Sequence, residues 1–270
     1  MLYNPLMQHL IHSTLLSQDA LSSCFTTRLD GVSKRPYHHN NLAFHVGDQK
    51  EDVLLNHQHL AKKMGYDHQR VVHMRQIHSD RITIVDPLLH DFENPPECDA
   101  LITDQTDIPL MVMTADCTPV LFFDPVNRVI AVAHAGRAGA LQGIVPKTIE
   151  KMSEHFGTLK EELLVVLGPS IGPCCYEVGK TIAQEVTEAG YAHAVVYEEG
   201  RHMLDVNAII HRQLQEAGVI KGHIDDLSIC NACHHETYFS YRADQQRTGR
   251  FAGVIMLNKD ENRTSDRTVC

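Results

Sequence analysis

Residues 115–136 read ADCTPVLFFDPVNRVIAVAHAG, and this stretch predicts a buried β-hairpin. Its two apolar runs, PVLFF and RVIAVA, have the length of strands, and the sequence DPVN between them is typical of a turn. A short turn pairs two strands antiparallel and brings their outer ends together. The hairpin therefore predicts that Cys117 and His134 lie at neighbouring positions at one edge of a sheet.

The rest of the chain predicts a mixture of strands and helices. Further apolar runs predict strands at residues 81–85, 108–114, 163–167 and 252–257. Helical spacing of apolar residues predicts helices at residues 51–64, 144–156, 180–189 and 205–217. Because several strand pairs resemble hairpins, we expect an α+β fold with one large mixed β-sheet flanked by helices on both faces. Residues 1–270 are expected to form a single domain, with 1–20 as an N-terminal extension and 258–270 as a polar tail.

The composition limits the classes of partner. The 270-residue chain carries a formal net charge of -10, which repels nucleic-acid phosphates, so no nucleic-acid binding is expected. No apolar run reaches the roughly 18 residues that a membrane-spanning helix needs. Residues 1–20 lack the basic and apolar regions of a secretory signal. We therefore expect a cytoplasmic protein with reduced cysteines, and a monomer, since no coiled-coil pattern is present.

Three separate segments each hold one soft metal ligand: His78, Cys117 and His134. Two imidazoles and one thiolate leave a fourth tetrahedral position open, which is typical of a catalytic rather than a structural zinc. The wide spacing favours a site assembled from different strand ends. The same residues also fit a nucleophilic Cys117 with His134 as its base, or a buried thiol beside two hydrogen-bonded histidines.

Two further segments contain paired cysteines. The sequence GPSIGPCCYEVG at 168–179 predicts a tight, irregular loop, either a complicated turn or a source of backbone amides for an anion. The adjacent Cys174 and Cys175 suit neither a zinc pair nor an easy disulfide. Cys230 and Cys233 have Cys-x-x-Cys spacing without a second such pair, which favours buried reduced thiols or a facultative disulfide over a zinc knuckle.

Polar groups occur in two more segments. Residues 237–242 predict an aromatic strand that ends in arginine, and TGR follows at 248–250. Such arginines either contact an anionic ligand or form structural salt bridges. Near the N-terminus, Arg28 and Asn41 are polar groups that could hydrogen-bond a substrate.

Taken together, these motifs resemble the laccase-domain family, also described as multicopper polyphenol oxidase-like proteins and as peptidoglycan editing factors. The resemblance runs from Phe25 to about Leu257. It is carried by QIHSD (76–80), CDALIT (98–103), ADCTPVLFFDP (115–125), AHAG (133–136), GPSIGPCCYEVG (168–179), FSYRAD (239–244) and TGR (248–250). Members are usually described as zinc-dependent purine nucleoside phosphorylases with adenosine deaminase side activity.

The resemblance implies a catalytic zinc, or alternatively copper, bound by His78, Cys117 and His134. It implies substrate contacts from Arg28, Asn41 and Gln76. It also implies a pentosyltransferase that acts on phosphate and a small nucleoside, with adenosine, inosine and methylthioadenosine as candidates.

The resemblance leaves three other functions to consider. The implied three-layer fold is shared with cysteine-hydrolase toxins, so a Cys117–His134 amidase acting on a peptidoglycan precursor is the alternative enzyme. A true laccase needs more histidine ligands than the matched motifs supply. A metal-stabilised binding module would need a fourth protein ligand, from His45 or the 230–235 segment.

The sequence departs from the family pattern at three places. Arg137-Ala138-Gly139 stands where Trp-Arg-Gly is usual, and Arg242-Ala243-Asp244 stands where two arginines precede the aspartate. The early loop reads Leu29-Asp30-Gly31-Val32-Ser33 rather than a double glycine. None of these departures removes a metal ligand, so they bear on substrate preference and rate.

Overall fold

The predicted hairpin forms the centre of the larger sheet. Strand β6 (Thr118–Asp124) pairs antiparallel with β7 (Val129–Ala135) over seven residues, with Pro119 opposite His134. The Asp124 carboxylate accepts hydrogen bonds from the backbone N–H groups of Val126 and Asn127, which closes the turn. The structure is a computed structural model that describes residues 9–259, so most of the predicted polar tail and the first eight residues lie outside it.

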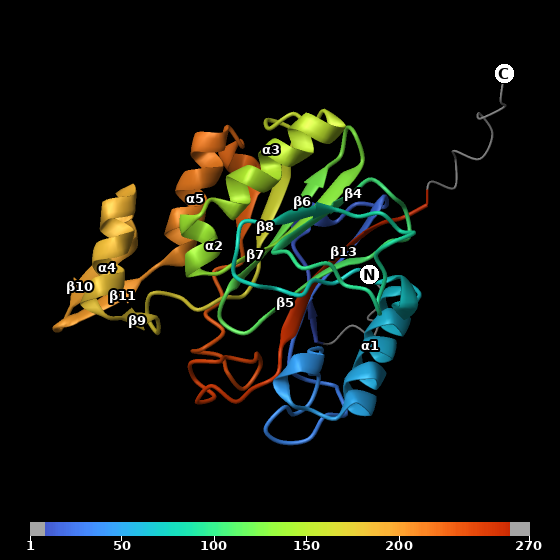
Figure 1. The fold of residues 1–270 in the computed structure, drawn as a ribbon, viewed down its shortest axis with the longest axis horizontal. Coiled ribbons are helices and arrows are strands. Elements are labelled where there is room, and N and C mark those ends of the chain that lie inside the picture. Colours follow the sequence, from blue (N-terminus) through green and yellow to red (C-terminus); the bar gives the residue numbers. More distant parts are fainter. Residues whose placement is uncertain (1–8, 260–270) are drawn as a thin grey trace.

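Six strands form a mixed sheet in the order β12-β8-β6-β7-β4-β3. The remaining members are β3 (Ile82–Ile84), β4 (Ala100–Thr103), β8 (Leu164–Leu167) and β12 (Ile224–Asp226). The outermost pairs are parallel and the central pairs are antiparallel. Figure 1 shows this sheet below helices α3 and α5.

Four other strands form a second, antiparallel sheet in the order β1-β2-β13-β5. They are β1 (Leu10–Ile11), β2 (Leu21–Thr26), β5 (Leu110–Thr114) and β13 (Phe251–Leu257). The mixed α+β class is confirmed, but the strands expected in one large sheet are divided between two. The division arises because β5 pairs with β13, whereas β6, the next strand along the chain, pairs with β7.

The two sheets pack face to face, with helices on the outer face of each. Alternate residues of β7 show this arrangement: Ala131 and Ala133 face the helices, whereas Ile130 and Val132 face the second sheet. All four are fully buried, which explains why β7 is a continuous apolar run. Full burial of the larger side chains, Ile130 and Val132, contributes roughly 1.5–3 kcal/mol each.

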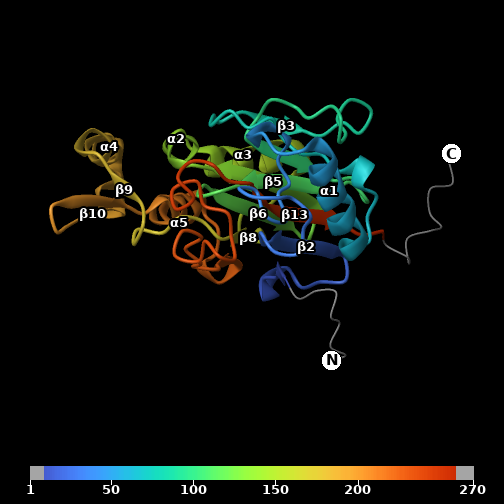
Figure 2. The same cartoon turned by 90° about the horizontal axis from the view of Figure 1, so that it is seen from below.

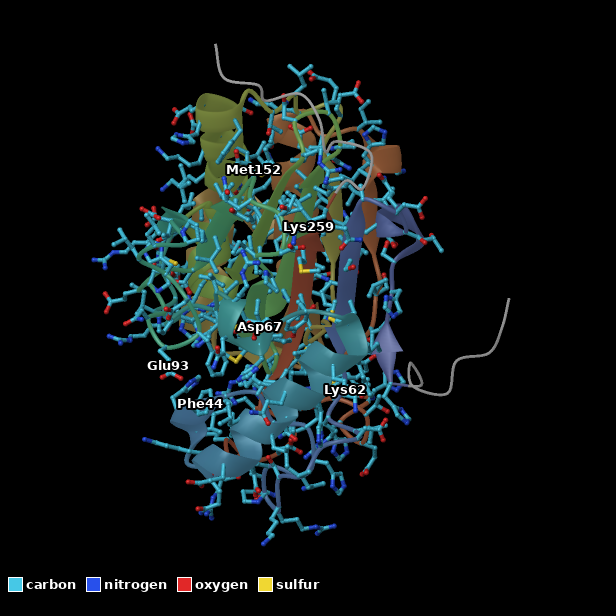
Figure 3. The ribbon with its side chains drawn as sticks, turned by 90° about the vertical axis from the view of Figure 1, so that its right-hand side faces the viewer. Phe44, Lys62, Asp67, Glu93, Met152 and Lys259 are labelled. Atoms are coloured by element: carbon cyan, nitrogen blue, oxygen red, sulfur yellow. The ribbon has the colours of Figure 1, made fainter. Side chains whose placement is uncertain are left out.

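Helices α2 (Arg137–Leu141), α3 (Ile144–Phe156) and α5 (Val206–Ala217) cover the six-stranded sheet. Helix α1 (Lys50–Met64) covers the outer face of the four-stranded sheet. Figure 3 shows the two helical layers at opposite ends of the molecule, with Met152 on α3 and Lys62 on α1. Within residues 9–259, no helix has both the length and the apolar character needed to cross a membrane.

A small outlying unit consists of α4 (Lys180–Val186) and a three-stranded sheet of β9 (Glu177–Val178), β10 (Val195–Glu198) and β11 (Arg201–Leu204). Figures 1 and 2 both show it projecting from the side of the molecule. Helix α4 is shorter than predicted, because a π-helical turn follows it and Gly190, with a φ of 93°, interrupts the regular helix.

The predicted aromatic strand at 237–242 is wrong, because this segment is a series of turns. Tyr238 and Phe239 are buried against Phe251, which accounts for their apolar character. The Phe239 carbonyl accepts a hydrogen bond from the Asn231 side chain instead of from a neighbouring strand. The segment is therefore held by side-chain contacts.

Candidate active site

Cys117 lies where the chain passes from the four-stranded sheet to the six-stranded sheet. Strand β5 ends at Thr114 and β6 begins at Thr118. Between them, Asp116 has a φ of 100°, a conformation that residues other than glycine seldom adopt. This sharp connection brings Cys117 to the edge of a cavity between the ends of both sheets.

The Asp116 carboxylate stabilises this conformation. It accepts hydrogen bonds from Ser240 Oγ at 2.6 Å, the Arg242 backbone N–H at 2.7 Å and Asn231 Nδ2 at 3.1 Å. Three donors from the segment 231–242 therefore hold the connection that carries Cys117. Asp116 is thus a positioning residue for the thiol.

The structure brings His78 and His134 to Cys117. The ligand atoms of the three residues all lie within 4.8 Å of one another, and Cys117 Sγ is 4.0 Å from His78 Nε2. The two imidazole rings are nearly perpendicular, with centroids 4.8 Å apart. Ligands of one tetrahedral zinc lie roughly 3.5 Å apart, so this spacing is close to what a single ion requires.

Asp99, which precedes β4, connects the two histidines. Its fully buried carboxylate accepts a hydrogen bond from His134 Nδ1 at 2.9 Å. It also accepts the backbone N–H groups of His78 at 3.1 Å and Ser79 at 2.7 Å. With Nδ1 donating to Asp99, Nε2 of the neutral imidazole is the nitrogen left to bind a metal, an arrangement common at metal-binding histidines.

The charges within this group stabilise one another. Burial raises the pKa of Cys117, but the His134 imidazole and hydrogen bonds from both histidines lower the pKa to about 6. Burial lowers the pKa of His134, yet the Cys117 thiolate and Asp99 raise the pKa to about 9. Burial raises the pKa of Asp99, and hydrogen bonds from His134 and Ser79 lower the pKa to about 2. Cys117 is therefore predisposed to be a thiolate, the form that binds metals.

Gly136, just after β7, leaves space for the thiol. A Cβ atom at this position would lie 2.7 Å from Cys117 Sγ and 3.4 Å from His78 Cδ2. The space that a side chain would fill is thus occupied by two of the three candidate ligands. Together with the converging soft donors, this close approach indicates that the residues fit a metal ion.

The three residues line a cavity of about 820 Å³, within the range of small-molecule sites. Its walls contain apolar, aromatic and cationic side chains from both sheets and from the segment 241–250. They include Met74, Met113, Ile171, Val206, Tyr176, Tyr241, Arg75, Arg137, Arg242 and Arg250. A ligand here meets apolar surface, aromatic faces and positive charge together.

Two of these arginines lie over tyrosine rings. The Arg242 guanidinium lies 5.2 Å from the Tyr176 ring centroid, and that of Arg250 lies 5.7 Å from the Tyr241 ring centroid. Among the described residues, neither guanidinium lies within 4.0 Å of a carboxylate. Each guanidinium instead donates through Nη1 to backbone carbonyls, Arg242 to that of Glu177 and Arg250 to those of Thr248 and Gly249. The positive charge of both side chains is therefore not neutralised by a salt bridge among the described residues.

The residues predicted to contact substrate lie in different environments. Gln76 lines the cavity, and its amide pairs with both the N–H and the C=O of Met113. Arg28 is buried and does not line the cavity. Its guanidinium forms an ion pair with Asp244 and donates a hydrogen bond to the His235 carbonyl.

Asn41 is also buried and does not line the cavity. Its side-chain oxygen accepts the Arg250 backbone N–H at 2.9 Å. Arg28 and Asn41 thus support the segments that carry the cavity arginines.

Asp99 and the cavity tyrosines were not predicted from the sequence. Asp99 lies in the CDALIT motif and directly before an apolar run, but neither feature identifies its partner. Tyr176 and Tyr241 lie in the GPSIGPCCYEVG and FSYRAD motifs, but the motifs do not show that the two rings line one cavity, because they are far apart in the sequence.

The fold and the cavity define an α+β protein with two sheets packed face to face and a candidate three-ligand site at the ends of these sheets. Residues 22–258 match the family described as multi-copper polyphenol oxidoreductase laccase. The chain belongs to this family.

Among its relatives are two bacterial proteins named purine nucleoside phosphorylase, one from Streptomyces coelicolor and one from Corynebacterium glutamicum. Each is 39% identical over 236 residues, which cover 87% of this chain and 94% of the relative. The human purine nucleoside phosphorylase LACC1 is 29% identical over 256 residues, 92% of this chain and 58% of the human protein.

Solved structures share the fold. The hypothetical protein YfiH of Bacillus licheniformis has a TM-score of 0.84 and 30% identity, covering 88% of this chain and 93% of that one. YlmD of Geobacillus stearothermophilus has a TM-score of 0.84 and 28% identity, covering 93% and 97%.

Proposed function

We propose that this protein is a zinc-dependent purine nucleoside phosphorylase. The observation that carries the proposal is one cavity containing three converging soft ligands together with two arginines that have no carboxylate partner among the described residues. The names of the relatives at 39% identity agree with it. Adenosine, inosine and methylthioadenosine are the proposed nucleosides.

In this reaction the C1′–N9 bond of the nucleoside breaks and a C1′–O bond to phosphate forms, while N9 of the departing purine takes up a proton. Arg242 and Arg250 supply the positive charge that binds phosphate and orients it for attack. Tyr176 and Tyr241 offer aromatic faces on which a purine or ribose can pack.

His78, Cys117 and His134 would hold the zinc ion, with Asp99 fixing the orientation of His134. When bound, zinc supplies a Lewis acid that stabilises developing negative charge or polarises a bound water. That water-activating chemistry also underlies the proposed adenosine deaminase side activity. Copper accepts the same donors, but multicopper oxidation needs further histidine-rich sites, and within residues 9–259 the other candidate cluster contains only cysteines.

The proposal is tested by measuring zinc content and base release from adenosine and inosine, with and without phosphate. About one zinc at this site and phosphate-dependent base release are expected. His78→Ala should lose both the metal and turnover, whereas His59→Ala, on the exposed face of α1, should lose neither. A His78→Ala protein that lacks this zinc yet keeps full phosphorolysis would overturn the proposal.

One observation favours a second candidate, a cysteine hydrolase. Asp99, His134 and Cys117 form a chain in which the pKa of the thiol is lowered and that of the imidazole is raised. Such an enzyme would act as an amidase on a peptidoglycan precursor. Activity that survives complete chelation but disappears when Cys117 is alkylated would support it over the phosphorylase.

A further inference from the structure

Four cysteines converge outside the candidate active site. The Sγ atoms of Cys174, Cys175, Cys230 and Cys233 all lie within 4.8 Å of one another. Cys233 Sγ lies 3.4 Å from that of Cys174 and 3.3 Å from that of Cys175. Nothing in the sequence pattern joins the two pairs, which are separated by more than fifty residues. Of the two states expected for Cys230 and Cys233, buried reduced thiols are wrong, because Cys233 is exposed and Cys230 is half-buried, whereas the facultative disulfide stays a prediction.

The arrangement is that of a four-ligand cluster rather than a disulfide pair. Cys233 is almost equally close to Cys174 and Cys175, and all four sulfur atoms lie within 4.8 Å of one another, so no single pair is set apart by distance. Four thiolates around one tetrahedral zinc, at about 2.3 Å from the ion, lie roughly 3.8 Å from one another. A zinc ion therefore satisfies all four sulfur atoms at nearly their present spacing.

The backbone around Cys230 is arranged to stabilise a thiolate. Cys230 Sγ accepts the backbone N–H of Gly172 at 3.3 Å and that of Cys233 at 3.5 Å. Hydrogen bonds from two N–H groups favour the charged form of the sulfur, which is the form that binds zinc.

The cluster is accessible to an ion from solvent. Cys174 and Cys233 are exposed, whereas Cys175 and Cys230 are half-buried. The four thiols thus lie at the protein surface, where metal entry requires no opening of the core. None of them lines the cavity that contains Cys117, so the two clusters are separate sites.

We propose that Cys174, Cys175, Cys230 and Cys233 bind a structural zinc ion that joins the loop 168–179 to the segment 230–233. Four protein ligands close the coordination sphere, which is typical of structural rather than catalytic zinc. Binding deprotonates the thiols that remain protonated, releases those protons to solvent and changes no oxidation state.

The position of the site indicates what this zinc would stabilise. Ile171 and Tyr176, on either side of the first cysteine pair, line the cavity. Asn231, within the second pair, donates to Asp116 beside Cys117. The zinc would therefore fix two walls of the active-site cavity relative to each other.

The test uses the full chain with the active-site ligand removed, so that its outcome does not depend on the proposed reaction. Cys117→Ala protein, purified and dialysed, is expected to retain about one zinc per chain by mass spectrometry. Adding Cys230→Ser and Cys233→Ser should reduce this zinc to near zero. Cys24→Ala, which removes a buried thiol from the four-stranded sheet, is the matched control and should leave it unchanged.

A second variant and a spectrum keep the test decisive if the double substitution prevents folding. Cys174→Ser changes only an exposed ligand, and it should weaken zinc retention in a chelator competition. Cobalt(II) in the Cys117→Ala protein should give the strong charge-transfer absorption of a tetrathiolate site. Three results would overturn the proposal: a zinc-free protein with four free thiols, a disulfide seen as a mass loss of two hydrogens, or iron in place of zinc.

Discussion

Nδ1 of His134 donates to the Asp99 carboxylate at 2.9 Å, and the same carboxylate accepts the backbone N–H of His78. One buried aspartate thus orients two of the three candidate metal ligands. Asp99 therefore connects strand β7 of the central hairpin to the loop that carries His78. The hairpin pattern in the sequence does not predict that this loop lies beside β7.

Replacing Asp99 tests this link. Asp99→Asn keeps the size of the side chain but removes the charge that orients His134, so metal affinity should fall roughly 10- to 100-fold. Competition against a zinc chelator measures the change. Asp104→Asn, at an exposed side chain that accepts a hydrogen bond from its neighbour Gln105, is the control. Equal affinities in the two variants would remove Asp99 from its positioning role.

Gly136 gives a steric test of the same site. In Gly136→Ala the new methyl group would lie 2.7 Å from Cys117 Sγ, so the thiol must move and zinc should bind at least about 10-fold more weakly. Gly179→Ala is a matched control, because Gly179 also precedes a helix with negative φ and its added Cβ meets no atom within 4 Å. Zinc titration of both proteins compares them, and unchanged binding by Gly136→Ala contradicts the steric argument.

Arg250 tests the phosphate site. Loss of a charge-assisted hydrogen bond worth about 1.5–3 kcal/mol should raise the KM for phosphate roughly 10- to 100-fold in Arg250→Gln. The KM for the nucleoside should change much less. Arg212→Gln on α5, where the exposed guanidinium binds Glu216, is the control and should leave both constants unchanged. A larger effect on nucleoside than on phosphate would assign Arg250 to the nucleoside instead.

His57 on α1 predicts a pH dependence of stability. Burial lowers its pKa from 6.5 to about 3, although Nε2 hydrogen-bonds the Leu42 carbonyl. Since the folded pKa lies below the unfolded pKa, the unfolded chain binds the proton first as pH falls. The stabilisation from neutral His57 is therefore fully present above pH 6.5 and is lost progressively toward pH 3.

Urea unfolding at two pH values measures this effect. Between about pH 7 and about pH 5, His57 should account for about 2 kcal/mol of lost unfolding free energy. Over this interval the His57→Gln protein should lose about 2 kcal/mol less unfolding free energy than the wild type does. His59→Gln, on the exposed face of the same helix, should behave as the wild type does. Identical pH slopes in all three proteins would show that His57 does not titrate as the burial predicts.

The sequence by itself determined the local elements. The hairpin of β6 and β7 follows from two apolar runs around a turn, because both faces of these strands are buried. Helix α5 begins after Asp205, whose side chain accepts the Ala208 N–H, and ends at Gly218 in a left-handed conformation. Propensity, turn chemistry and capping are local properties, so they can be read along the chain.

The tertiary structure alone decided which elements meet. The division into two sheets depends on β5 pairing with β13, more than a hundred residues away. Asp99 at His134, and Cys174 beside Cys233, depend in the same way on distant segments packing together. Apolar periodicity shows which face of a strand is buried. It does not show which sheet or helix packs on that face, because the packing partner depends on how the whole chain folds.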